Sequence, residues 1–116
     1  MKNIEPLTPP AFYVLLALSQ RERHGYDIMK TVAGDSIGKV RLGPGTLYGL
    51  IKRLLSEGLI IESHARPDPS FDNERRRYYR LTDDGRRRLG TELLRMEQAI
   101  KRAHQLGVKF GSLTEP

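Results

Sequence analysis

The chain contains no cysteine and no tryptophan, and its longest apolar run covers only residues 11–18. Without cysteine there can be no disulfide, thiol nucleophile or cysteine-ligated zinc, so we expect no redox chemistry. The apolar run is too short to cross a bilayer, and the first residues lack a signal-peptide pattern. We therefore expect a cytoplasmic protein without a membrane partner.

Signals of catalysis are also missing. The three histidines lie far apart in the sequence, without the carboxylate spacing of a metal site, and are better explained as surface or structural residues. Gly43 and Gly45 lack the further glycine and the lysine of a phosphate-binding loop. We predict a protein that is not an enzyme and that needs neither metal nor cofactor.

Positive charge is what the chain has in excess. Its 116 residues carry 20 lysines and arginines against 14 acids, a formal net charge of +6. The length suits one compact domain, and the charge favours a polyanionic partner such as nucleic acid.

Local signals predict three helices in the first half. Thr8, Pro9 and Pro10 suit a helix start, so the first helix should cover residues 9–19. Its apolar surface is broad, which suggests that part of it, including Phe12, meets a partner subunit. A second, short helix should begin near His24 and end at the glycines that follow residue 33.

The third helix should start at Pro44 and stop before Gly58. One arc is apolar and predicts the core: Leu47, Leu50, Ile51, Leu54 and Leu55. The opposite side is small and cationic: Gly45, Gly49, Lys52 and Ser56, flanked by Tyr48 and Arg53. Such a face would let the helix backbone come close to another surface.

Two strands, at residues 59–64 and 77–81, should form a hairpin around a long polar tip. Alternation places side chains of the second strand on two faces: Arg76, Tyr78 and Arg80 on one, and Arg75, Arg77, Tyr79 and Leu81 on the other. Arginines near such a tip can reach DNA phosphates or the minor groove.

A last helix should run from the cap Thr82 to about Gly107. Its apolar positions form a short heptad seam: Leu89, Leu93, Met96, Ile100 and Ala103. The seam predicts a homodimer, although it could instead pack inside a monomer. The expected organisation is a winged helix-turn-helix over residues 1–82, a dimerisation helix over 83–107 and a tail over 108–116. The fold class is mainly α with a small β-hairpin, an α+β fold.

Three separated motifs resemble the PadR family of transcriptional regulators. They are His24-Gly25-Tyr26; Gly45-Thr46-Leu47-Tyr48 with Lys52-Arg53-Leu54 and Glu57-Gly58-Leu59-Ile60; and Arg77-Tyr78-Tyr79-Arg80-Leu81-Thr82 with Gly85. The resemblance covers residues 7–103, and the single C-terminal helix is similar to that of the small subgroup. Gly43 and Gly49 depart from the hydroxyl residue and the proline that are common in the family.

The resemblance implies a homodimer that binds an inverted repeat in double-stranded promoter DNA, usually as a repressor released by a small molecule. It places DNA contacts on Tyr26, Thr46, Tyr48, Lys52 and the wing arginines Arg75, Arg76 and Arg77, to which the residue pattern adds Arg53. Some small members hold aromatic drugs between paired tryptophans, which this chain lacks. A DNA regulator of this kind would be associated with the nucleoid.

Other interpretations remain open. The same charge would serve a nucleic-acid or RNA binder without sequence preference, and a winged fold can also act as a protein-interaction adaptor. Tyr26 and Tyr48 could be half-buried core residues with hydrated hydroxyls. Arg86 to Arg88 are better explained as a solvated helix face.

Overall fold

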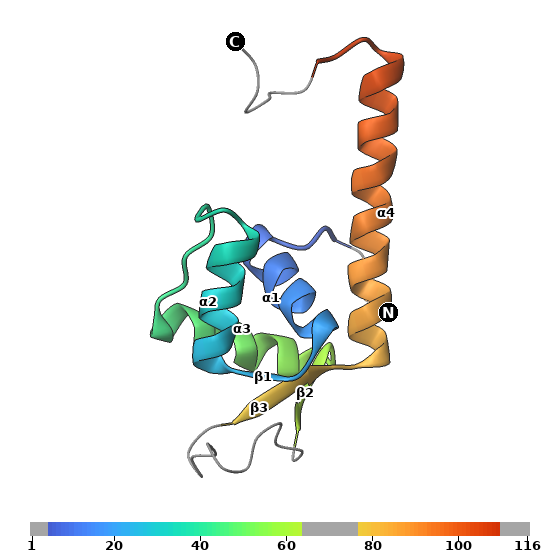
Figure 1. The fold of residues 1–116 in the computed structure, drawn as a ribbon. Coiled ribbons are helices and arrows are strands. Elements are labelled where there is room, and N and C mark those ends of the chain that lie inside the picture. The colour runs from blue at the N-terminus through green and yellow to red at the C-terminus, as the bar shows by residue number, and fades with distance from the viewer. Residues whose placement is uncertain (1–4, 64–76, 110–116) are drawn as a thin grey trace.

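The computed structural model describes residues 5–63 and 77–109. In these ranges the chain forms α1 (Pro9–Gln20), β1 (Arg23–His24), α2 (Gly25–Asp35), α3 (Pro44–Ser56), β2 (Ile60–Ser63), β3 (Tyr78–Leu81) and α4 (Asp83–Gln105). Helices α1 to α3 pack over the small sheet, and the C-terminal half of α4 extends beyond them (Figure 1). The predicted α+β class, a winged helix-turn-helix followed by a long helix, is confirmed.

Helix α1 begins where its local signals predict. The Thr8 hydroxyl accepts a hydrogen bond from the Ala11 N–H at 3.3 Å, and prolines occupy the first turn. The helix packs against α2, β3 and α4. Its broad apolar surface is used inside the chain, and Phe12, predicted to meet a partner, is only 7% exposed.

Helix α3 begins and ends where predicted, but its buried face is narrower than the apolar arc predicted from the sequence. Gly43 is its N-cap without a side-chain hydrogen bond, and Gly58, just beyond its end, has a φ of 75° that favours glycine. Leu47, Ile51 and Leu54 are buried. Leu55, predicted to lie in the core, is 36% exposed because it lies at the edge of the apolar arc.

The sheet has three antiparallel strands in the order β1-β3-β2. Strand β2 pairs with β3 from Ile60 opposite Leu81 to Ser63 opposite Tyr78. Strand β1 pairs with the other side of β3, placing His24 opposite Tyr78. The sequence predicted only the hairpin, because a strand of two residues has no period that a pattern could reveal.

Burial along β3 departs from strict alternation. Arg80 is exposed and Tyr79, predicted for the opposite face, is buried, but Tyr78, predicted for the face of Arg80, is buried as well. The ring of His24 contacts the ring of Tyr78 edge-on, with 5.3 Å between the centroids. His24 of β1 therefore covers a side of the Tyr78 ring that the hairpin alone would leave open.

Helix α4 is joined to the winged part through its first turn. The Thr82 hydroxyl accepts from the Gly85 N–H at 3.0 Å and donates to the Gly58 carbonyl at 2.7 Å. Asp83 and Asp84 lie in the first turn, where negative charge is favoured by the helix dipole. The cap therefore starts α4 and also ties it to the end of α3.

The segment before α1 is bound to the side of α4. The buried Glu92 carboxylate accepts from the Leu7 N–H at 3.1 Å and pairs with Arg95 at 2.7 Å. One turn earlier, Arg88 donates to the Glu5 carbonyl at 2.7 Å, so this arginine does more than face solvent. These contacts fix the N-terminal half of α4 against the body.

The predicted heptad seam changes character along α4. Leu89 is buried in the core of the chain. Leu93, Met96 and Ile100 are 43%, 38% and 48% exposed, and Ala103 is partly exposed. The seam therefore begins as core and continues as an apolar row with no partner within the described part of the chain.

Candidate nucleic-acid interface

The outward face of α3 carries the predicted contact residues Thr46, Tyr48 and Lys52. Thr46 and Lys52 are exposed, and Tyr48 is 50% exposed. A Cβ built at Gly45 or Gly49 would meet no atom within 4 Å, so neither glycine is needed for packing inside the chain. The backbone of α3 is consequently accessible to another molecule along this face.

Arg53 lies on a different edge of α3. Its guanidinium pairs with Glu57 at 3.2 Å, and it lines a surface pocket together with Glu5 and Arg88. It is about 140° around the helix from Tyr48. The structure thus places Tyr48 and Arg53 on opposite flanks of the outward face.

Tyr26 projects from the first turn of α2 and is 62% exposed, so it is not a core residue. The Lys30 ammonium lies 5.6 Å from the centre of its ring, one turn further along the helix. This cation–π contact keeps the Lys30 ammonium close to the Tyr26 ring. Sequence reasoning missed Lys30, although its spacing of four from Tyr26 on a predicted helix is a usable signal.

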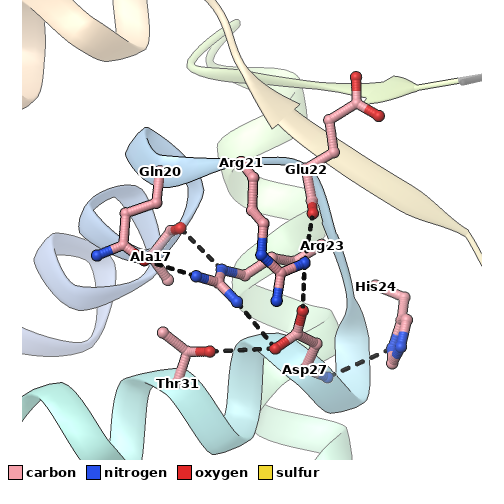
Figure 2. A network of polar contacts seen from close by, with 8 residues as sticks. All are labelled: Ala17, Gln20, Arg21, Glu22, Arg23, His24, Asp27 and Thr31. Atoms are coloured by element: carbon pink, nitrogen blue, oxygen red, sulfur yellow. Dashed lines mark hydrogen bonds and ion pairs between the residues drawn. The ribbon is translucent and has the colours of Figure 1, made fainter. Parts of the chain in front are cut away.

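A buried arginine joins the end of α1 to the start of α2 (Figure 2). Arg23 is 5% exposed, and its Nε donates to the Ala17 carbonyl at 2.9 Å, which helps to satisfy the end of α1. Its other two nitrogens donate to Gln20 at 2.7 Å and to Asp27 at 3.0 Å. The guanidinium therefore fixes the start of α2 relative to the end of α1.

Asp27 is the acceptor shared by this network (Figure 2). Beside Arg23, it pairs with Arg21 at 3.3 Å and accepts from the Thr31 hydroxyl at 3.1 Å. Its own N–H donates to Nδ1 of His24, the N-cap of α2, at 3.3 Å. The first turn of α2, which carries Tyr26, is thus held on several sides.

Tyr48 lies between α2 and the wing. A Cβ at Gly25 would be 2.3 Å from the Tyr48 hydroxyl oxygen, so the phenol lies directly against the start of α2. Burial raises the pKa of the Tyr79 phenol, as do the nearby Glu62 and Tyr48, whereas Arg77 lowers it. Tyr48 therefore lies near enough to Tyr79 to act on the pKa of that phenol.

The described part of the wing presents two cations. Arg77 is exposed and pairs with Glu62 at 3.3 Å, and Arg80 is exposed on the strand. A surface pair of this kind is weak and can exchange for a phosphate. Arg75 and Arg76 lie outside the described residues. Exposed Lys39 and Arg41, which sequence reasoning missed, precede α3.

No cluster of histidine, aspartate or glutamate that could hold a metal ion occurs in residues 5–63 and 77–109. Within the same ranges, no helix combines the length and the apolar character that a membrane span requires.

A helix with an open, cationic outward face beside a β-hairpin wing defines the class of winged helix-turn-helix DNA-binding proteins. The chain belongs to the Transcriptional regulator PadR-like family, whose profile matches residues 14–91. The resemblance in its motifs is thereby confirmed.

Solved structures agree with this assignment. A PadR family transcription regulator from Clostridium difficile R20291 is 25% identical, with a TM-score of 0.69 over 85% of this chain and 98% of that one. A transcriptional regulator from Clostridium thermocellum shares the fold at 23% identity, with a TM-score of 0.65 over 83% and 87% of the two chains. BpsR of Bordetella bronchiseptica, whose DNA binding is regulated by 6-hydroxynicotinic acid, is 28% identical, with a TM-score of 0.62 over 93% and 68%. No curated protein matches the chain.

Proposed function

We propose that the protein is a sequence-specific transcriptional regulator that binds double-stranded DNA as a homodimer. The observation that carries the proposal is the outward face of α3, where Thr46, Lys52 and half of Tyr48 are accessible beside the wing. This helix would enter the major groove, and Tyr26 would contact the flanking backbone. Membership of the PadR-like family supports the same assignment.

Charge supports DNA as the partner. The formal net charge of +6 attracts a polyanion, and each phosphate that a lysine or arginine neutralises releases bound counterions. Exposed cations lie on α3 (Lys52), on the wing (Arg77 and Arg80) and in the segment before α3 (Lys39 and Arg41). Binding should therefore weaken steeply as salt is raised.

The apolar row on α4 supports the dimer. Leu93, Met96 and Ile100 are 38–48% exposed, and self-association would remove them from water. In our proposal residues 83–107 dimerise, and residues 1–82 bind DNA. Two recognition helices related by a two-fold axis would match an inverted-repeat operator.

Repression, released by a small molecule, is the proposed mode of control. It is supported by the resemblance to regulators of this family and by the similarity to BpsR, whose DNA binding responds to 6-hydroxynicotinic acid. A repressor of this kind would act in the cytoplasm at the nucleoid.

A gel-shift experiment tests the proposal. The purified protein is mixed with promoter DNA upstream of its own gene, at two salt concentrations, with excess scrambled duplex as competitor. A discrete complex that resists the competitor is expected, and footprinting should then show protection of an inverted repeat.

The same experiment separates the alternatives. If scrambled DNA competes equally well on every promoter tested, and also on fragments selected from the whole genome, the protein is a nucleic-acid binder without sequence preference. A protein with no affinity for any duplex or RNA would instead be an adaptor on a winged fold.

A further inference from the structure

We infer that Gly25 is a positioning residue for DNA binding: its missing side chain makes the space in which the Tyr48 phenol lies against α2. The inference rests on the proposed function. It connects two motifs, His24-Gly25-Tyr26 and Gly45-Thr46-Leu47-Tyr48, that are some twenty residues apart in the sequence.

The contact itself is close. A Cβ at Gly25 would lie 2.3 Å from the Tyr48 hydroxyl oxygen, 2.8 Å from Cζ and 3.2 Å from Cε1. Gly25 is buried and does not have a positive φ, so backbone freedom gives no reason for glycine here. The position of the Tyr48 phenol does give a reason, because a side chain at residue 25 would overlap it.

Tyr48 has one covered side and one open side. It is 50% exposed, which leaves part of the residue accessible to DNA. On the covered side is Gly25, whose missing side chain leaves room for the phenol. The position of the phenol is consequently set by α2, an element outside the recognition helix.

The start of α2 is a firm support for this phenol. It is held to α1 through Arg23 and Asp27, and His24 caps it (Figure 2). The same turn carries Tyr26. Because Gly25 is adjacent to Tyr26, the contact also fixes the spacing between the two exposed tyrosines, both of which we place against the DNA.

An added methyl group at position 25 should move the phenol without unfolding the protein. The atoms it would meet belong to the far end of a side chain that can rotate, in contrast to Gly85, where a Cβ would meet the Leu59 carbonyl oxygen at 2.1 Å. Restoring a normal contact requires the hydroxyl to move by roughly 1 Å, enough to spoil a hydrogen bond.

The experiment is a double-substitution cycle in the full chain. Gly25→Ala, Tyr48→Ala and the combined variant are compared with the unsubstituted protein for operator affinity, by fluorescence anisotropy, and for thermal unfolding. Gly34→Ala is the matched control, because Gly34 lies in the same helix and a Cβ there would meet nothing within 4 Å.

We expect Gly25→Ala to weaken operator binding about tenfold or more, the loss of a hydrogen bond to a charged group, while its unfolding temperature stays close to that of Gly34→Ala. Gly34→Ala should bind normally. In the Tyr48→Ala background, Gly25→Ala should cause no further loss, because the phenol it displaces is absent.

Four results would overturn the inference. Three concern Gly25→Ala: normal binding, an equal loss in both backgrounds, or unfolding, which would show that the phenol cannot move aside. The fourth is normal operator binding by Tyr48→Ala. If the unsubstituted protein fails to select any duplex, the proposed function falls and this inference falls with it; the other outcomes leave the proposed function intact.

Discussion

Replacing Gly85 by alanine should destabilise the junction between the winged part and α4. The new Cβ would lie 2.1 Å from the Leu59 carbonyl oxygen and 2.8 Å from Cδ1 of Leu81. That carbonyl also accepts from the Thr82 N–H at 3.1 Å, so moving it strains the helix start as well.

The magnitude follows from three contributions. Overpacking costs about 1–3 kcal/mol, and loss of the Thr82 hydrogen bond costs about 1 kcal/mol. Alanine recovers up to about 1 kcal/mol of helix propensity, and less in a first turn. A net loss of about 2 kcal/mol in the free energy of unfolding should lower the melting temperature by roughly 10 °C.

Thermal and urea unfolding followed by circular dichroism would measure the effect. Gly90→Ala is the matched control in the same helix, because a Cβ at Gly90 meets nothing within 4 Å, and its stability should be unchanged or raised. If Gly85→Ala is as stable as Gly90→Ala, the close approach of α4 to Leu59 is refuted.

Three further predictions concern DNA, the dimer and pH. Lys52→Glu should weaken operator binding at least about tenfold with an unchanged circular dichroism spectrum, since it sets a carboxylate against DNA; normal binding would remove Lys52 from the interface. Met96→Asp should convert the proposed dimer to monomer in analytical ultracentrifugation, whereas Leu94→Asp, at a residue that is 52% exposed on another side of α4, should not; identical behaviour of the two variants would argue against dimerisation through the seam. The pKa of Tyr79 is raised from 10.0, so its stabilising contribution is complete below pH 10 and is lost as pH rises through the raised value. The difference in unfolding free energy from Tyr79→Phe should therefore be constant below pH 10 and shrink above it, and a constant difference throughout would contradict the burial of the phenol.

Several elements were predictable because their signals are local. The start of α1 depends on Thr8 and two prolines, and that of α4 on Thr82. The end of α3 depends on Gly58, whose φ is positive. Each signal acts within one helical turn and needs no distant partner.

Other features depend on packing between distant segments. Strand β1 exists because β3 offers a free edge, and its two residues have no strand pattern of their own. The burial of Tyr78 follows from the same pairing. Arg23 would be expected at the surface from its charge, but the end of α1 and Asp27 supply enough acceptors to bury it.

In the candidate site, too, some features were predictable from the sequence and others were not. The sequence placed Thr46, Tyr48 and Lys52 outside the apolar arc of a helix, since that position depends only on helical period. It missed Lys30, which lies beside Tyr26, and it could not tell that Tyr48 lies against the start of α2.

By itself, the sequence determined the class of the protein, its main helices and the residues of the outward face of α3, because composition, caps and periodicity are properties of neighbouring residues. The tertiary structure decided which apolar residues form the core and which remain exposed on α4. It also decided that Gly25 and Tyr48 meet, because contact between distant segments depends on how the helices pack, and no local pattern records it.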